Sequence, residues 1–336
     1  REDRQRNGSL SISGIWSLYE DRSGLLWLGT AGAGLNQRNA SVHRFNSLTH
    51  DPVNDNSLSH SFVWDLQEDS GGRIWIATPD GINRYTPESG EILRIGAGEP
   101  LRHMQSLQFD TTGTLWAGTA SGHLYRLPPG EHQLIPHGLQ DRASGKVSQS
   151  RVWYLGASER KTLWMGLSEG LYELDPRSGE FSIVIEACDE IPMGTSAIRT
   201  SLADTDGGFW FGGGGAGLIH FDRDQGVTAV LGQTADQPDS LSNNQVRSLY
   251  LSPEGHLWVG THNGLNLLRN EEGESSWDNG ATRQLIGSRV QIRSPSFMRG
   301  RTLNDTFLII DEAQNFTPKQ LKSLVTRAGR NTKIVC

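Results

Sequence analysis

Short stretches of alternating or clustered apolar residues recur along the first 270 residues of the chain. Two of them, 15–20 and 25–30, have the length of β-strands and are separated by a segment of the form Asp-x-x-Gly. In such a turn the aspartate accepts backbone hydrogen bonds and the glycine takes the left-handed conformation. The pattern therefore predicts short antiparallel strands joined by tight turns.

A tryptophan marks the same position in six copies of this unit. The six tryptophans follow one another at intervals of 48, 41, 48, 46 and 48 residues: Trp27, Trp75, Trp116, Trp164, Trp210 and Trp258. An apolar residue precedes each one, glycine or alanine follows two positions later, and the tripeptide Ser-Leu-Ser recurs upstream at Ser9, Ser57 and Ser240. A repeat of about 40 to 48 residues has the size of one propeller blade. The predicted fold is mainly β, a β-propeller of about six four-stranded blades.

We interpret the six tryptophans as structural blade anchors that fill the space between neighbouring blades, with ligand stacking as the alternative. The aspartate of the turn is expected to be a turn residue rather than a metal ligand. The ten histidines show no ligand spacing of the His-x-x-x-His type, so no metal site is assigned to them. A ligand is expected on one face, in loops that differ between blades, and the long segments 46–60 and 231–245 are candidates.

Charge divides the chain into two unlike parts. Residues 283–336 carry 10 Lys and Arg against 3 Asp and Glu, whereas the remaining 282 residues carry 21 against 35. This asymmetry predicts separate modules, with the propeller at 1–270, a linker at 271–296 and a second module at 297–336. The two cysteines, Cys188 and Cys336, provide no disulfide framework, and no apolar run approaches the length of about 20 residues that crosses a membrane.

The second module reads as a strand, a helix and a second strand. The apolar run 307–310 is typical of a strand in a parallel sheet, and it ends in Asp311 and Glu312. Thr317 with Gln320 forms a capping box, Pro318 suits the first helical position, and the segment 333–336 reads as the next strand. A strand that ends in two acids is typical of a Walker B segment. We therefore expect a short α/β fragment of a P-loop NTPase.

The propeller repeats resemble a known family. The sequences at 21–30 (DRSGLLWLGT), 69–78 (DSGGRIWIAT) and 255–261 (GHLWVGT) resemble the two-component regulator propeller repeat, and the resemblance extends over about 10–270. It implies the extracytoplasmic, periplasmic sensor half of a hybrid histidine kinase, with a ligand from outside the cytoplasm, a glycan among the candidates. The kinase domain that would act as partner is not in this chain. The propeller itself is expected to need no cofactor.

The segment 297–336 resembles the PhoH family of ATPases. The strings that carry this resemblance are FMRGRTLN at 297–304, IIDEAQN at 309–315 and TPKQ at 317–320. It implies that Asp311 would hold Mg²⁺ and that Asp311 and Glu312 would be the catalytic pair in ATP hydrolysis. By the same resemblance, the nucleotide or RNA contacts would be Gln314, Asn315, Arg299 and Arg301. ATP and Mg²⁺ would be cofactors only of a complete domain, and RNA would be its partner.

That family needs a Gly-Lys-Ser/Thr loop to hold the triphosphate, and the sequence contains none, since Val147 follows Gly145 and Lys146. The segment is therefore expected to be inactive as it stands. Two function classes remain open, a ligand-sensing propeller of a two-component sensor and a PhoH-type ATPase linked to RNA metabolism. A protein-interaction scaffold is a third. The PhoH resemblance implies the cytoplasm and the propeller resemblance the periplasm, and 271–296 holds no membrane helix. Our hypothesis is a composite of two gene fragments, truncated at both ends.

Overall fold

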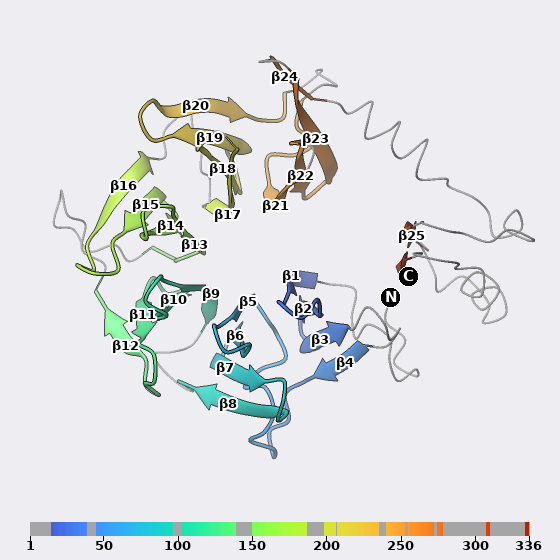
Figure 1. Ribbon diagram of the computed structural model, residues 1–336, viewed down its shortest axis with the longest axis vertical. Coiled ribbons are helices and arrows are strands. Elements are labelled where there is room, and N and C mark those ends of the chain that lie inside the picture. Colours follow the sequence, from blue (N-terminus) through green and yellow to red (C-terminus); the bar gives the residue numbers. More distant parts are fainter. Residues whose placement is uncertain are drawn as a thin grey trace, which may run out of the picture.

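The computed structural model describes residues 15–38, 45–96, 103–138, 150–186, 198–205, 207–234, 240–252, 255–271, 274–277, 307–309 and 333–335. Six four-stranded antiparallel sheets follow one another around a central axis (Figure 1), and in each sheet the strand order follows the chain. The predicted propeller of six four-stranded blades is confirmed. Among the described residues there is no helix.

The first three blades comprise twelve strands. Blade 1 contains β1 (Ile15–Glu20), β2 (Leu26–Thr30), β3 (Leu35–Arg38) and β4 (Phe45–Leu48). Blade 2 contains β5 (Asp65–Glu68), β6 (Ile74–Thr78), β7 (Gly81–Thr86) and β8 (Glu91–Ile95). Blade 3 contains β9 (Met104–Phe109), β10 (Leu115–Thr119), β11 (Leu124–Leu127) and β12 (Ile135–His137).

The other three blades have the same plan. Blade 4 contains β13 (Tyr154–Ala157), β14 (Leu163–Leu167), β15 (Gly170–Leu174) and β16 (Phe181–Glu186). Blade 5 contains β17 (Ile198–Ala203), β18 (Phe209–Gly213), β19 (Leu218–Asp222) and β20 (Gly226–Leu231). Blade 6 contains β21 (Val246–Leu251), β22 (Leu257–Thr261), β23 (Gly264–Glu271) and β24 (Glu274–Trp277), so it extends beyond residue 270.

The first strand of each blade lies nearest the axis and the fourth lies at the rim (Figure 1). Because each blade repeats the same strand order, the six innermost strands run in the same direction along the axis. Residues at the start of these strands, which are β1, β5, β9, β13, β17 and β21, therefore lie at one end of the propeller.

Five apolar cores hold the described blades together, and each core lies between two successive blades. The anchor Trp116 of blade 3 illustrates the arrangement, because it packs with Val152 and Leu155 of blade 4. Four of the six anchors, Trp27, Trp75, Trp116 and Trp164, are at most 6 % exposed. Trp210 and Trp258 are half-buried. Within the described residues, no such core joins blade 6 to blade 1.

In blades 1, 3, 4 and 5 the glycine two positions after the anchor makes room for the next blade. A Cβ atom added at Gly29 would lie 2.7 Å from Val63 Cγ1 of blade 2, and one added at Gly118 would lie 2.7 Å from Val152 Cβ of blade 4. The residue that fills the space is fully buried in both cases. The repeated glycine is therefore a packing requirement of the blade interface rather than of a turn.

The turn aspartate fixes the anchor as well as the turn. Asp21 Oδ1 accepts hydrogen bonds from the backbone N–H groups of Ser23 and Leu25, and Asp21 Oδ2 accepts one from Trp27 Nε1 at 2.7 Å. Burial opposes ionisation of Asp21, but the hydrogen bonds from Ser23 and Trp27 hold its pKa below the usual value. The same indole bond recurs in three other blades, between Trp75 and Asp69, Trp116 and Asp110, and Trp210 and Asp204.

Blade 4 replaces this bond with an ion-pair cluster. Ser158 stands where four of the other five blades have aspartate, and within the described residues Trp164 Nε1 has no hydrogen-bond partner. Instead, the guanidinium of Arg223 from blade 5 lies 4.6 Å from the centre of the Trp164 ring. Arg223 also donates to both carboxylate oxygens of Glu173, at 2.7 and 2.9 Å. A cation–π contact and a bidentate ion pair thus join blades 4 and 5.

The carboxylate of Asp65 bridges blades 2 and 3. Its Oδ2 accepts a hydrogen bond from the Leu107 N–H of β9 at 2.7 Å, and its Oδ1 accepts one from the Leu66 N–H at 2.8 Å. Burial raises the pKa of Asp65 to about 6 despite these two hydrogen bonds.

We expect Asp65 to make stability fall as the pH rises from about 4 to about 6. Over this range the folded state binds a proton that the unfolded state has released, so at about 1.4 kcal/mol per pH unit the loss approaches about 3 kcal/mol. Urea denaturation of the wild type and of Asp65→Ser across this range measures it, because serine occupies the same register position in blades 1, 3 and 6. A constant difference between the two proteins would contradict the expectation.

Two short strands near the C-terminus pair in parallel. Phe307–Ile309 (β25) pairs with Lys333–Val335 (β26), with Leu308 opposite Ile334. The parallel direction is the one expected for the two strands of a strand–helix–strand unit. The segment expected to form the helix lies outside the described residues.

Candidate functional site

A β-bulge occupies the same place on the innermost strand of several blades. The pairing shifts by one residue between Ile15 and Ser17 in β1, between Ile198 and Thr200 in β17, and between Val246 and Ser248 in β21. The residue inside each bulge is unpaired, and a bulge re-aims the side chain that it carries.

Six residues that are equivalent in the repeat lie at the start of the innermost strands and therefore at the same end of the axis. Each stands eleven positions before the anchor tryptophan of its own blade: Trp16, Trp64, Gln105, Trp153, Arg199 and Arg247. The residue just before each of the last five is apolar and fully buried in a blade interface: Val63, Met104, Val152, Ile198 and Val246. We call these six residues and their neighbours Phe62 and Arg151 the axial site.

Blades 1 and 2 give the axial site an aromatic side. The Trp16 and Trp64 ring centres are 5.1 Å apart in an edge-on arrangement, and Phe62 lies 4.5 Å from Trp64 and 5.8 Å from Trp16. Trp16 is 46 % exposed, although tryptophan is usually well buried. An exposed indole supported by two other rings offers a flat apolar surface at low cost in conformational entropy.

Blades 4, 5 and 6 give the axial site a basic side. The guanidinium groups of Arg151 and Arg199 lie 4.4 and 4.3 Å from the centre of the Trp153 ring. Burial lowers the pKa of Arg199 to about 10, and repulsion from Arg247 and Arg151 adds to the effect. Arg247 is exposed and donates a hydrogen bond to Gln245 Oε1 at 3.1 Å.

The chemistry of the axial site favours binding over catalysis. Its residues are three tryptophans, one phenylalanine, three arginines and one glutamine, and they include no nucleophile or general base. Aromatic rings stack on flat ligands, and guanidinium groups bind oxyanions through paired hydrogen bonds. No group of metal-ligating side chains is found among the described residues.

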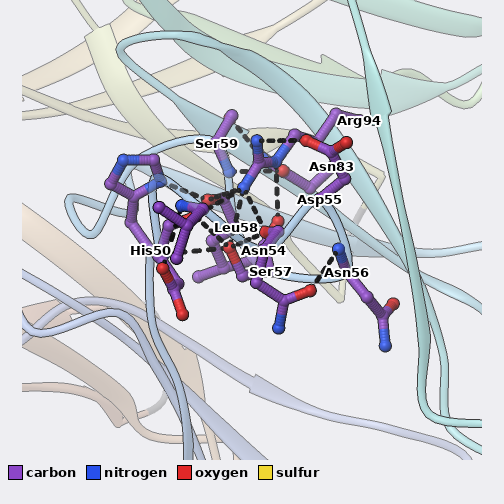
Figure 2. Close-up of polar contacts among 11 residues, drawn as sticks. His50, Asn54, Asp55, Asn56, Ser57, Leu58, Ser59, Asn83 and Arg94 are labelled. Atoms are coloured by element: carbon purple, nitrogen blue, oxygen red, sulfur yellow. Dashed lines mark hydrogen bonds and ion pairs between the residues drawn. The ribbon is translucent and has the colours of Figure 1, made fainter.

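The long segment 46–60 is an inter-blade clamp, as Figure 2 shows. The guanidinium of Arg94 on β8 donates to Asn54 O at 2.9 Å, to Ser57 O at 2.8 Å and to Ser57 Oγ at 2.7 Å. Asp55 Oδ1 forms an ion pair with Arg94 at 3.4 Å, and His50 Nδ1 lies 2.7 Å from Leu58 O. Because these polar groups bind one another, the segment fastens blade 1 to blade 2. In the other candidate segment, 231–245, residues 235–239 lie outside the described residues.

The residues assigned to nucleotide chemistry are not among those that the structure describes. This holds for Asp311 and Glu312, for Gln314 and Asn315, and for Arg299 and Arg301. Their predicted roles stay predictions.

Sequence reasoning did not find the axial site. Its residues share a register position but not a residue type, so no motif marks them. The signal in the sequence is that each of the six equivalent residues stands eleven positions before an anchor tryptophan. Five of these six residues are tryptophan or arginine, and those five are exposed or half-buried. Aligning the six repeats on their anchors and reading this column would have identified it.

Two families match different parts of the chain. Residues 9–32, 57–80 and 240–263 match the family described as two-component regulator propeller. Residues 275–336 match the family described as PhoH-like protein. Within the described part of the chain, no helix is long and apolar enough to cross a membrane.

Solved propellers are similar in fold. The extracellular domain of a hybrid two-component system from B. thetaiotaomicron has a TM-score of 0.67 and 19 % identity, over 81 % of this chain and 35 % of that one. Virginiamycin B lyase from Staphylococcus aureus has a TM-score of 0.61 and 15 % identity, over 81 % of this chain and 86 % of the lyase. Similarity at this level of identity shows the fold alone.

The C-terminal segment has curated relatives. The PhoH-like protein of Mycobacterium leprae is 50 % identical over 46 residues, which are 14 % of this chain and 13 % of that protein. Protein PhoH2 of Bacillus subtilis is 50 % identical over 50 residues, or 15 % and 11 % of the two chains. The match thus spans a small part of these relatives. The chain carries two-component regulator propeller repeats, whose structural neighbours include extracellular domains of two-component sensors, followed by a PhoH-like segment.

Proposed function

We propose that the propeller is the ligand-sensing module of a two-component sensor and that its ligand binds at the axial site. One observation carries the proposal. A single register position holds different side chains in successive blades, and most of them are aromatic or basic groups that reach solvent. In blades 2 to 6 a buried apolar residue precedes this position, and in all six blades an anchor tryptophan follows it. Binding residues on a rigid, repeated scaffold are typical of recognition modules.

The sensor proposal also assigns a location. Two structural neighbours are extracellular domains of two-component or one-component systems, and the repeats match a family described by that regulatory role. We therefore propose that the propeller faces the outside of the cytoplasm, as a periplasmic domain would. Its partner would be a histidine kinase domain, which receives the signal.

Binding measurements on the purified chain test the sensor proposal. A panel of neutral and acidic oligosaccharides is screened by thermal shift, and each hit is measured by calorimetry with wild type, Trp16→Ala and Tyr250→Ala. Trp16 belongs to the axial site, whereas Tyr250 is 59 % exposed toward the other end of an innermost strand. We expect Trp16→Ala to weaken binding about tenfold because a stacking surface is lost. Tyr250→Ala should bind like wild type. Equal binding by the two variants, or no hit, would contradict the proposal.

A second function is favoured by a different part of the chain. We propose that the PhoH-like segment derives from an ATP-binding protein whose nucleotide loop lies outside this chain, and that the segment is inactive by itself. The family match at 275–336 and the parallel pairing of β25 with β26 support it. Calorimetry with Mg²⁺ and ATP tests it. Binding that is lost in Asp311→Asn would show that the segment works in this chain and would overturn its assignment as inactive.

A further inference from the structure

The basic side of the axial site gathers like charges in an acidic module. Residues 1–282 carry 35 acidic and 21 basic side chains, yet Arg151, Arg199 and Arg247 come from three successive blades to one end of the axis. Arg199 is half-buried, and burial lowers its pKa, with a further contribution from repulsion by the other two arginines. Holding positive charges together is unfavourable in the free protein, and a bound anion would relieve it.

Trp153 holds two of these guanidinium groups in place. The guanidinium carbons of Arg151 and Arg199 both lie less than 4.5 Å from the centre of its ring. Arg151 is fixed further, because its Nε donates a hydrogen bond to Ala120 O of blade 3 at 3.3 Å. A guanidinium whose face packs on an aromatic ring can donate hydrogen bonds from its edge, in its own plane. The site is therefore partly organised before any ligand arrives.

The aromatic side supplies the complementary contact. Trp16, Trp64 and Phe62 form one ring cluster, and Trp16 keeps nearly half of its surface exposed. Both sides start from the same end of the six innermost strands. Ligands that carry a ring with an apolar face and a negative group combine both requirements.

We propose that the axial site binds an oxyanion carried on a ring with an apolar face, with the anion at Arg199 and Arg247 and the ring on the tryptophan cluster. The inference rests on the proposed sensor function and names the chemical class of its ligand. The oxyanion is a carboxylate, sulfate or phosphate group, which are the groups that arginine binds through paired hydrogen bonds. The ring belongs to an acidic sugar or to an aromatic acid, and the choice of probes separates these two sources.

Four probes test the inference by calorimetry at low ionic strength. Digalacturonate carries carboxylates on sugar rings, its dimethyl ester is the neutral counterpart, benzoate carries a carboxylate on an aromatic ring, and sulfate has no ring. We expect at least one of the two acids to bind more tightly than sulfate. If digalacturonate binds, we expect its dimethyl ester to bind at least about tenfold more weakly. Losing a charge-assisted hydrogen bond corresponds to about this change in affinity.

Arg247→Gln and Arg126→Gln form the matched pair of variants. Arg247 is exposed in the axial site, and Arg126 is exposed on β11, away from the innermost strands. We expect Arg247→Gln to weaken binding of the acids about tenfold, with Arg126→Gln unchanged and both variants folded by circular dichroism. No anion binding, equal binding of the ester, or equal loss in the two variants would overturn the inference. If the ester binds and requires Trp16, the sensor proposal survives while the anion inference fails.

Discussion

Replacing Trp116 with alanine is expected to lower the free energy of unfolding by about 4 kcal/mol. Trp116 is 1 % exposed and lies in the core between blades 3 and 4, so the change removes a large buried ring and leaves a cavity. It also removes the indole N–H that donates a hydrogen bond to Asp110 Oδ2 at 2.9 Å. Urea denaturation followed by circular dichroism measures the loss.

Trp258→Ala is the matched control for this change. Trp258 occupies the same repeat position in blade 6, but it is half-buried, and no apolar core on its far side is found among the described residues. We expect it to lower the free energy of unfolding by less than about 2 kcal/mol, because less surface is uncovered and no closed cavity forms. Equal losses for the two variants would show that burial between blades is not what makes the anchor important.

Gly118→Ala is expected to destabilise the protein by about 2 to 3 kcal/mol, although it adds a single methyl group. The added Cβ would lie 2.7 Å from Val152 Cβ and closer still to Val152 Cγ1, in a fully packed interface. Real Cβ atoms do not tolerate such contacts, so blade 4 must move away from blade 3. The midpoint of urea denaturation and the melting temperature both report the change.

Gly260→Ala is the control, because Gly260 has the same repeat position but contacts no described residue of another blade. There the new Cβ would meet Ser248 Oγ, the end of a side chain that can rotate, and its next contact is at 3.7 Å. We expect a change of less than about 1 kcal/mol. A large loss at Gly260 would mean that the glycine serves the conformation of its own strand rather than packing between blades.

The fold was predictable because its determinants are local and repeated. Alternating apolar residues, the Asp-x-x-Gly turn and the spacing of the tryptophans lie within one repeat and occur six times, so each copy supports the assignment of the others. The hydrogen bond from the anchor to the turn aspartate is also local, since the two residues are six positions apart. The sequence predicted that the aspartate forms the turn, but it did not predict that the aspartate also accepts a hydrogen bond from the anchor indole.

The contacts between blades were harder to predict. Arg223 reaches Glu173, 50 residues away, and Arg94 reaches Ser57, 37 residues away. No periodic pattern reports such pairs, because each blade interface uses different polar residues. The axial site was not predicted from the sequence for a related reason, since its residues differ in type from blade to blade. Only the position of Trp16 and its five counterparts relative to the anchors links them.

The succession of cores has a consequence for how the molecule opens. Because each described core joins a blade to the next one only, we expect the described blades to behave as a one-dimensional array in which stability is a sum of nearest-neighbour terms. Blades 1 and 6 each take part in one described core, and the four blades between them take part in two. Opening should therefore begin as fraying at the two end blades, with amide hydrogens exchanging most slowly in blades 3 and 4.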